Sequence, residues 1–509
     1  MKLLKNIVLA STLILTVSSC SKDYLDTKPT NSTSTETAFE STTNAKMVIN
    51  GLAKLMTRQY LGSQGFNGEG TIKMYYGNYP GENFFVNLSG WSNIINGEFY
   101  ESFNSIYDYY PWYYYYMIVS NANAVIARID AATGPDTEKK FIKAQALTYR
   151  AYCFFMLSQL YANRWADSNN GAGKGILLRT DLSTGDMALS TLAETYKQVY
   201  DDLDLAIKLY GESGLKRANN YSMDINVAYA VYARAAITKQ DWALAESYAV
   251  KAREGYPLMN NTDYKSGFNR PTSEWIWSSY GAEDETLYFY SYHAYIAYNS
   301  TASAVRTYPK CISKTLYDKI PATDIRKGMF LNPAGYTYTA STGVAGTALT
   351  AKARTDYPAL QSNATAYAYM NFKISNIAQA GVGHLNHFRS SEMYLIEAEA
   401  KHMQNKPAEE VQNVLLQLIR TSGRDASYTV NKTGAALLQE IKTYRGIELW
   451  GEGFDWFDKK RWNEPIERLA FDKGGNFISS LAVTIQPSQK NKWTWVVPAK
   501  ETDFNTLSK

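Results

Sequence analysis

Apolar residues recur every three or four positions along much of this chain. Between residues 138 and 161, for example, Leu147, Ala151 and Phe155 would share one face of a helix, because an α-helix turns once in about 3.6 residues. The chain is therefore expected to be mainly α-helical. The same spacing predicts helical segments at 38–61, 112–130, 138–161, 191–210, 226–254 and 390–420.

The predicted helices combine into about four helix pairs of the tetratricopeptide type, in which small and aromatic residues pack neighbouring helices together. The turn at 239–242 is as tight as such a pair requires, and Pro407 ends one helix before the next begins. We therefore expect a helical-repeat scaffold. Its predicted pairs are 37–61 with 112–130, 141–161 with 191–210, 226–238 with 241–254, and 390–404 with 408–420.

Two long stretches, 62–110 and 257–388, interrupt the repeats. They are rich in glycine and aromatic residues, and only a short part of them has a helical period. Residues 274–279 predict a short strand within the second stretch. Long loops in compact domains are usually functional or disordered, and the aromatic content argues against disorder. We expect irregular insertions that carry short strands and the binding residues.

The first twenty residues predict a targeting segment rather than part of the fold. Lys2 and Lys5 flank the start of an apolar run, 7–17, that is too short to span a bilayer. Residues 17–20 then resemble a bacterial lipobox, in which small residues precede the cysteine that becomes the first mature residue. We expect residues 1–19 to be a lipoprotein signal peptide. An ordinary secretory signal with a chance cysteine is the alternative.

A charged and aromatic stretch at 444–462 is the most distinctive part of the sequence. As a helix it places Arg445, Glu448 and Glu452 three and four residues apart, where opposite charges can meet. Aromatic side chains alternate with charged ones after Gly453, and so many rings cannot all face water. The stretch therefore predicts a partly buried ionic cluster packed by aromatic rings at a junction between helices.

Two segments of the sequence carry a resemblance to a known family. GIELWGEGFDWFDKKRW at 446–462 and RSSEMYLIEAEA at 389–400 resemble the paired C-terminal motifs of the SusD/RagB family, outer-membrane lipoproteins of Bacteroidetes that capture nutrients. SNANAVIARID at 120–130 also resembles the second helix of that family. The resemblance covers nearly the whole chain. It implies one SusD-like domain over 38–509, in which the 446–462 motif serves packing rather than chemistry.

The resemblance also implies where the protein works. Cys20 would be acylated, and residues 20–37 would form a lipidated tether at the cell-surface side of the outer membrane. The chain would contact the membrane through this lipid anchor only, and stable anchoring needs more than one acyl chain. The implied partner is a SusC-like TonB-dependent transporter. In the family, ligand contacts come from insertions that pack on the repeats.

Composition excludes one class of partner and leaves another open. Lys and Arg number 52 against 48 Asp and Glu, a net charge of +4, so no nucleic-acid partner is expected. The 41 tyrosines and 11 tryptophans suit a sugar-binding surface, which is apolar and hydrogen-bonding at once, but they also suit a thick helical core. Cys153 and Cys311 are expected to be unpaired.

The sequence predicts no catalytic, metal or cofactor site. His384 and His387 are three residues apart, but no HExxH motif or cysteine pair accompanies them. The glycines at 62–70 lack the pattern of a phosphate-binding loop, and no nucleophile elbow occurs. A catalytic use of Asp455 and Asp458 is a minority alternative.

A glycan site needs exposed aromatic rings for stacking and polar side chains at the edges of the sugar. Both insertions supply these residue types, although a core position is the alternative for each aromatic residue. Trp91, between Ser89-Gly90 and Ser92-Asn93, is the strongest single candidate. The other candidates are Tyr75, Tyr76, Asn78, Glu82 and Asn83 in the first insertion and Tyr288, Tyr290, Tyr292, His293 and Tyr295 in the second.

Together these features predict a binding lipoprotein without catalysis, which captures an oligosaccharide or polysaccharide fragment and delivers it to its transporter. The alternative is a peptide-binding lipoprotein, or one whose helical repeats serve only to dock on another protein. Exposed tyrosine and tryptophan rings would mark a capture surface, whereas small and apolar residues on outer repeat helices would mark a docking surface.

Overall fold

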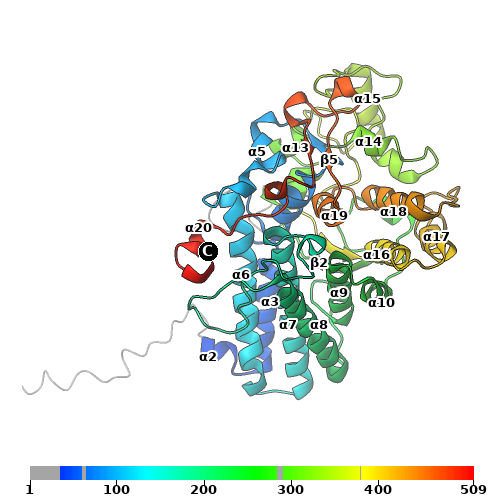
Figure 1. Cartoon of the computed structure of the whole chain (residues 1–509). Coiled ribbons are helices and arrows are strands. Elements are labelled where there is room, and N and C mark those ends of the chain that lie inside the picture. Colours follow the sequence, from blue (N-terminus) through cyan, green and yellow to red (C-terminus); the bar gives the residue numbers. More distant parts are fainter. Residues whose placement is uncertain (1–34, 60–64, 284–289, 379, 509) are drawn as a thin grey trace, which may run out of the picture.

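The structure, a computed structural model, describes residues 35–59, 65–283, 290–378 and 380–508. Long helices form most of this part of the chain, and short strands connect its irregular segments (Figure 1). The predicted mainly α-helical class is confirmed. Residues 1–34, which include the predicted signal peptide and Cys20, lie outside the described residues, as does Tyr288.

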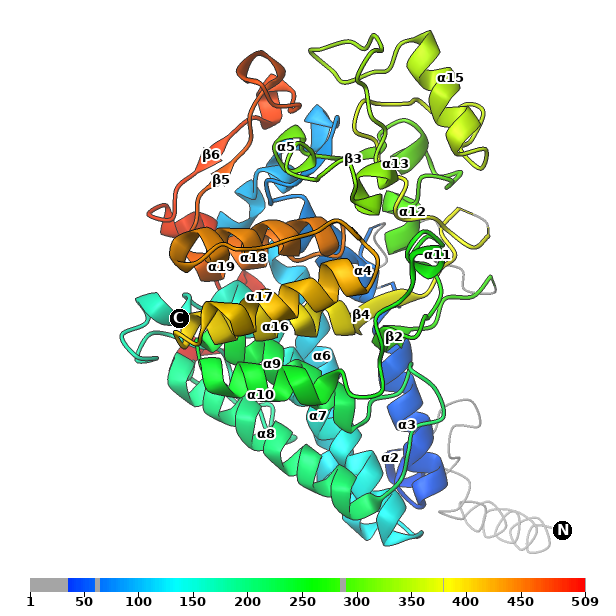
Figure 2. The same ribbon diagram turned by 90° about the vertical axis from the view of Figure 1, so that its right-hand side faces the viewer.

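Within the described residues, four helix pairs form the scaffold, as the sequence predicts. α3 packs against α6, α7 against α8, α9 against α10, and α16 against α17. In Figure 2 the helices lie one above another from α8 through α10 to α16 and α17. Their bounds are α3 (Thr42–Leu55), α6 (Ile106–Arg128), α7 (Asp136–Tyr161), α8 (Leu192–Ser213), α9 (Ile225–Lys239), α10 (Trp242–Ala252), α16 (Ser390–Met403) and α17 (Ala408–Leu416).

The fourth pair joins the stack although the long second insertion precedes it. α10 packs directly against α16, and α16 packs in turn against α18 (Gly434–Glu448). The insertion therefore leaves the stack after α10 and returns to it at α16, and in Figure 2 its elements α12, α13 and α15 lie to the side of the stack and above it.

The helix predicted from residue 112 begins earlier, at Ile106, with Pro111 inside it. Ser105 caps it by accepting a hydrogen bond from the Tyr107 amide at 3.2 Å. A proline cannot donate the usual amide hydrogen bond to the carbonyl four residues earlier, which here is that of Tyr107. This carbonyl instead accepts a hydrogen bond from the Tyr76 hydroxyl at 2.7 Å. The first insertion is therefore attached to α6 at the carbonyl that the proline leaves free.

The first predicted helix, 38–61, is shorter than expected: α3 begins only at Thr42, and a separate short helix, α2 (Thr35–Ala38), precedes it. Ser41 lies between them in an extended conformation, and its side chain accepts a hydrogen bond from the Asn44 amide at 3.2 Å. A serine that caps a helix in this way starts a new helix rather than continuing the old one.

The first insertion is more helical than predicted. α4 (Gly68–Thr71) leads directly into a π-helix, η2 (Ile72–Asn78), and every residue of both segments is buried. A helix that is buried on all sides has no polar face, so hydrophobic periodicity could not reveal it. π-Helical turns are rare and often occur at functional sites.

Short strands join the two insertions to each other. β1 from the first insertion pairs antiparallel with β3 from the second, with Phe85 opposite Cys311. The strand predicted at 274–279 is present as β2 and pairs with β4 at the end of the same insertion. Both Cys153 and Cys311 are free thiols in the core. The strand bounds are β1 (Phe84–Val86), β2 (Trp275–Ser279), β3 (Lys310–Ile312), β4 (Leu385–Arg389), β5 (Ile466–Glu467) and β6 (Thr484–Ile485).

Shorter helices complete the insertions and the C-terminal region. They are α5 (Ser92–Ile95), α11 (Asn261–Tyr264), α12 (Tyr292–Ile296), α13 (Ser303–Arg306), α14 (Lys314–Tyr317), α15 (Thr347–Asp356), α19 (Asp455–Trp462) and α20 (Ala499–Thr502).

Arg389, directly before α16, lies at the centre of a buried ionic cluster. Its guanidinium is 2.6 Å from a carboxylate oxygen of Glu274, 2.7 Å from Glu448 and 2.8 Å from Glu452. Three further cations pair with the same carboxylates or with a neighbouring one. We call this group the ionic core; it consists of Glu274, Asp324, Arg326, Lys373, Arg389, Arg424, Glu448 and Glu452.

The predicted ionic cluster is therefore present, but it is fully buried and its ion pairs differ from those expected. Arg445 pairs with Asp458 at 2.6 Å rather than with Glu448 or Glu452. The reason is that α18 ends at Glu448, and Gly451 and Gly453 then adopt φ of +82° and +88°. Glycine reaches these left-handed conformations without strain, and the turn moves Glu452 off the helical face.

Aromatic rings pack against the cations of the ionic core, but these rings come from the second insertion rather than from the predicted stretch 444–462. The Phe268 ring lies 5.4 Å from the Arg389 guanidinium and 4.7 Å from the Lys373 ammonium. Tyr264 lies 4.7 Å from Arg424 in the same manner. Contacts of this kind are attractive because the faces of aromatic rings carry partial negative charge.

Replacing Arg389 tests how far the fold depends on the ionic core. Arg389→Met keeps much of the side-chain volume but leaves three buried carboxylates without their shared cation. We expect a loss of about 3–5 kcal/mol in the free energy of unfolding, measured by urea denaturation. The matched control is Lys197→Met, which breaks an exposed pair with Asp201 and should cost less than about 1 kcal/mol. Equal losses in the two variants would contradict the assignment.

The ionic core also predicts acid sensitivity. Burial alone would raise the pKa of Glu452, but Arg389 and Lys373 lower it from 4.5 to about 2. A lowered folded-state pKa stabilises the fold above the unfolded-state pKa, and this stabilisation is lost as the pH falls through about 4 towards 2.

Glu452→Gln should therefore be less stable than the wild-type protein at pH 7, and the difference should shrink as the pH falls from about 5 to about 2. The pKa difference corresponds to about 3 kcal/mol. Urea denaturation at several pH values measures it, and a difference that stays constant down to pH 2 would contradict the pairing.

Candidate functional site

Four aromatic side chains meet where the two insertions come together. Tyr75 lies at the centre, with its ring centroid 5.8 Å from that of Trp91, 6.1 Å from Tyr107 and 5.9 Å from Tyr295. The rings of Trp91 and Tyr295 are themselves 6.4 Å apart. We call these four residues, Tyr75, Trp91, Tyr107 and Tyr295, the aromatic platform.

The members of the platform differ in exposure. Tyr75 and Tyr295 are buried, at 2% and 8% exposed, rather than open as the sequence predicts, whereas Trp91 and Tyr107 are partly exposed. The hydroxyls of Tyr75 and Tyr295 are hydrogen-bonded at 3.1 Å. Tyr75 and Tyr295 therefore support the two partly exposed rings from below and present little surface of their own.

The backbone of Trp91 is held by a short turn, whereas its side chain is partly exposed. It ends a short 3₁₀ turn, Ser89–Trp91, in which its amide donates to the Leu88 carbonyl at 3.0 Å. Ser89, Gly90 and Asn93 are exposed around it. An aromatic ring bordered by small polar residues is the arrangement that the sequence predicts for a sugar-stacking position.

Tyr290 lies beside this group and is partly exposed. Burial raises the pKa of Tyr295, and the phenols of Tyr290 and Tyr107 add to the increase. Both insertions therefore contribute candidate residues to the same place, which their separation in the sequence did not reveal.

Two other predicted stacking residues lie in the core. The Tyr76 and Tyr292 rings are buried, and their hydroxyls donate to the carbonyls of Tyr107 and Gly451, each at 2.7 Å. A ring enclosed on both faces offers no surface to a sugar. These two tyrosines therefore pack the interior, and His293 is buried beside Tyr292.

Asn78 also has a structural position rather than the exposed one predicted. Its side-chain amide donates to the Gly451 carbonyl at 2.7 Å and accepts from the Gly453 amide at 2.9 Å. The neighbouring Gly77 has no room for a side chain, because a Cβ atom there would lie 2.1 Å from the Gly453 carbonyl oxygen. The π-helix therefore lies directly on the turn that follows α18.

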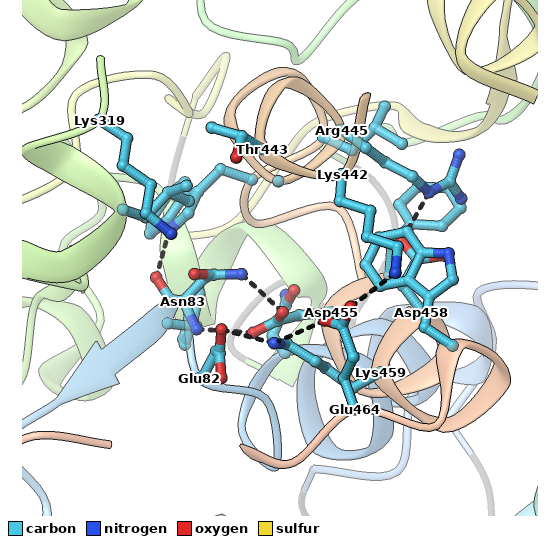
Figure 3. A pocket seen from close by; sticks show the side chains of 18 of the residues that line it. Glu82, Asn83, Lys319, Lys442, Thr443, Arg445, Asp455, Asp458, Lys459 and Glu464 are labelled. Carbon is cyan, nitrogen blue, oxygen red and sulfur yellow. Dashed lines mark hydrogen bonds and ion pairs between the residues drawn. The ribbon is translucent and has the colours of Figure 1, made fainter. Parts of the chain in front are cut away.

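Glu82 and Asn83 line an open cleft beside α18 and α19 (Figure 3). Glu82 pairs with Lys459 at 2.8 Å. The backbone and side-chain amides of Asn83 both donate to Asp455 at 2.7 Å. These polar groups are thus already bonded to side chains of α19, so they connect the first insertion to the C-terminal motif.

Asp455 is a carboxyl in this cleft whose pKa is raised. Burial and the neighbouring Glu82 raise its pKa to about 7, although the bonds from Asn83 oppose the increase. A cleft carboxyl with a raised pKa can mark a catalytic acid or base. Here, however, both oxygens of Asp455 accept hydrogen bonds from Asn83, which gives the carboxyl a structural task.

The histidines of the second insertion have aromatic and hydroxyl neighbours. His387 is hydrogen-bonded to the Ser279 hydroxyl at 2.7 Å, and His384 stacks on Tyr221. Among the residues that the structure describes, no group of three His, Cys, Asp or Glu side chains could hold a metal ion. In the same part of the chain, no helix combines the length and apolar character that crossing a membrane requires.

Tyr107 is the platform residue that the sequence did not single out. It lies just before a run of mostly aromatic residues, 109–116, that predicts helix packing. Tyr107 therefore does not stand out in the sequence as a binding candidate. The sequence feature that could have pointed to Tyr107 is Pro111. A proline inside a helix cannot bond to the carbonyl four residues earlier, so that carbonyl can accept a hydrogen bond from another partner. That partner is Tyr76 of the first insertion, and the contact brings Tyr107 to the platform.

Two family models match successive parts of the chain. One is described as "Starch-binding associating with outer membrane" and matches residues 23–237; the SusD family model matches residues 236–506. Together they span nearly all of the sequence. No curated protein matches the chain significantly.

Solved structures share the fold at low sequence identity. A SusD-like carbohydrate binding protein from Bacteroides vulgatus has a TM-score of 0.74 at 22% identity, over 92% of this chain and 98% of its own. A SusD superfamily protein from Bacteroides thetaiotaomicron gives 0.72 at 20%, over 92% and 99%. A SusD-like carbohydrate binding protein from Bacteroides fragilis gives 0.68 at 15%, over 93% and 100%.

Sequence identities this low establish a shared fold alone, whereas the family models establish family membership. The SusD family model by itself matches more than half of the residues, and its match contains both C-terminal motifs, 389–400 and 446–462. By this match the chain belongs to the SusD family.

Proposed function

We propose that this protein captures an oligosaccharide or a polysaccharide fragment on the aromatic platform and releases it uncleaved. The observation that carries the proposal is the partly exposed Trp91 ring, held from below by Tyr75 and bordered by Tyr295 from the other insertion. The C–H faces of a sugar stack on aromatic rings, and its hydroxyls bond to polar groups at the rim. Ser89 and Asn93 provide such groups beside Trp91.

Two observations favour a sugar over a peptide as the ligand. Two of the solved structures that share the fold are of carbohydrate binding proteins. In addition, the residues on both sides of Trp91, from Ser89 to Asn93, are all neutral, which suits an uncharged polyhydroxy ligand better than the charged termini of a peptide.

The proposal includes the location and the partner. An acylated Cys20 would hold the protein at the cell-surface side of the outer membrane, and the captured fragment would pass to a SusC-like TonB-dependent transporter. The family description of starch-binding proteins that associate with the outer membrane supports this placement. The lipobox-like residues 17–20 support the anchor.

Release without cleavage is part of the proposal because Asp455 and Asp458, the two carboxylates considered for catalysis, are bonded to other side chains. Asp455 accepts two hydrogen bonds from Asn83, and Asp458 pairs with Arg445 and Arg461. A glycosidase needs two carboxyl groups that are free to face the bond to be cleaved. In their present positions these two hold α19 in place.

One observation favours the alternative, a protein-docking role. Large apolar side chains are exposed near the C-terminal end of the described chain: Phe504 is 83% exposed and Leu507 57%. Phe504 and Leu182 line the same hollow beside α6. An apolar surface of this kind suits the outer-membrane partner, and capture and docking can be served by different faces of one molecule.

Trp91→Ala should weaken glycan binding while leaving the fold intact. Removing one stacked ring should cost about 2 kcal/mol, or about thirtyfold in Kd. Calorimetry with plant, host and microbial glycans, starch fragments and peptides identifies the ligand and measures the effect. The matched control is Tyr336→Ala, another exposed aromatic residue, which should bind like the wild-type protein.

The same titrations test each part of the proposal. Equal affinities of Trp91→Ala and wild-type protein would exclude the platform as the binding surface. Cleavage of a panel member would contradict release without cleavage. A folded protein that binds only peptides, or binds nothing, would favour the alternative functions.

Tyr75→Phe tests whether the buried ring positions the platform. The variant keeps the ring contacts with Trp91 and Tyr107 but removes the hydroxyl that bonds to Tyr295. We expect glycan affinity to fall by about 1 kcal/mol, clearly less than in Trp91→Ala. A larger loss in Tyr75→Phe than in Trp91→Ala would indicate that the ligand contacts Tyr75 itself.

A further inference from the structure

A second cavity lies beside α12, separate from the aromatic platform. It is bordered by α4, the start of α12 and the ends of β2 and β4, which lie close to one another in Figure 2. It is open to solvent, and the empty space in it, part of which is open solvent, is about 470 Å³. Part of its wall is backbone, contributed by Gly70, Gly281, Gly381 and Gly383.

Two residues that line the cavity each have a deeply buried polar atom without a hydrogen-bond partner. They are the side-chain amide nitrogen of Asn67, a residue that is 3% exposed, and Nε2 of His293, which is 1% exposed. Buried polar groups are nearly always paired, because an unpaired one loses its bonds to water and gains none in return. Two such atoms in one cavity indicate that something else completes their hydrogen bonds.

The two atoms are complementary, one a donor and the other an acceptor. Burial lowers the pKa of His293 to about 4, so the ring is neutral at pH 7. A hydrogen bond to the Phe268 backbone carbonyl engages the other ring nitrogen, which therefore carries the proton and leaves a lone pair on Nε2. The Asn67 nitrogen can only donate.

The His293 ring packs closely against a glycine of the cavity wall. A Cβ atom on Gly383 would lie 2.6 Å from the imidazole, so the ring lies flat against the Gly383 backbone. The acceptor is thus fixed in position before any ligand arrives.

An aromatic ring stands at the edge of the same cavity. Tyr280 lines it and is 55% exposed. Its ring packs edge-on against Tyr221 at 5.3 Å and His384 at 5.0 Å between centroids. These contacts orient the Tyr280 ring while more than half of the residue stays open to solvent.

We propose that this cavity is a second binding site, for a single neutral sugar residue. One sugar hydroxyl donates to Nε2 of His293 and accepts from the Asn67 amide, and the C–H face of the sugar lies against Tyr280. A hydroxyl fits because it is a donor and an acceptor at once. A carboxylate has no proton for His293, and an ammonium group has no lone pair for Asn67.

The proposal stands independently of the platform, since the two sites share no residue. It gives the protein two places on which one branched or long glycan, or two short ones, can be held at once. Two linked contacts raise the overall affinity well above that of either alone when the ligand spans both.

The test uses the four histidines of the chain. Protein labelled with ¹³C at histidine Cε1 gives one NMR signal for each, and single His→Gln variants assign them; if His293→Gln does not fold, the other three variants assign its signal by elimination. The probes are D-glucose, D-galactose, D-mannose and N-acetyl-D-glucosamine, titrated to high millimolar concentration. His402, in the last turn of α16, is the internal control.

For at least one sugar we expect a saturable shift of the His293 signal and no shift of His402. The response should persist in Trp91→Ala and in the control Tyr336→Ala, and its Kd should rise at least tenfold in Tyr280→Ala. The proposal is overturned if no sugar gives a saturable His293 response, which would leave a buried water as the partner of the two atoms. It is also overturned if the response disappears in Trp91→Ala or is unchanged in Tyr280→Ala. Because Trp91→Ala affects only the platform, failure of one site is distinguishable from failure of the other.

Discussion

The pairing of Arg389 with three buried carboxylates is the interaction on which the rest of the structure depends. Glu274 comes from the second insertion, Glu448 ends α18, and Glu452 lies in the turn that follows. Removing the shared cation would leave these charges uncompensated in the interior, which is far more costly than losing a surface pair. The ionic core therefore fixes how the fourth helix pair, the second insertion and the C-terminal motif lie against one another.

A series of contacts leads from the ionic core to the aromatic platform. Lys73 donates to the backbone carbonyl of Glu452 at 2.9 Å, and Asn78 bonds to the glycines on either side of that residue. Both belong to the π-helix that also carries Tyr75, and Tyr75 contacts Trp91. The family motif thus supports the aromatic platform without being part of it, because it sets the position of the segment on which the exposed rings rest.

The helical pairs could be predicted from the sequence because hydrophobic periodicity is local, whereas the partners of Glu448 could not, since Arg326 and Arg389 lie 122 and 59 residues away. The candidate binding residues likewise divide into those that the sequence could identify and those that it could not. Small polar neighbours marked Trp91 as open, and the structure leaves it partly exposed. Tyr76 offered no comparable signal, because tyrosine suits a core as well as a surface, and its burial follows from a hydrogen bond to a distant helix.

We propose that the two insertions, held together by the repeats and the ionic core, form one sugar-binding surface. The most direct measurement is an experimental structure of the protein with a bound oligosaccharide chosen from the binding panel. The expected result is a sugar ring stacked on Trp91, with Tyr295 at its edge and the two insertions paired as β1 and β3. An oligosaccharide bound in the cleft beside α18 and α19, with the Trp91 ring uncovered, would contradict the claim.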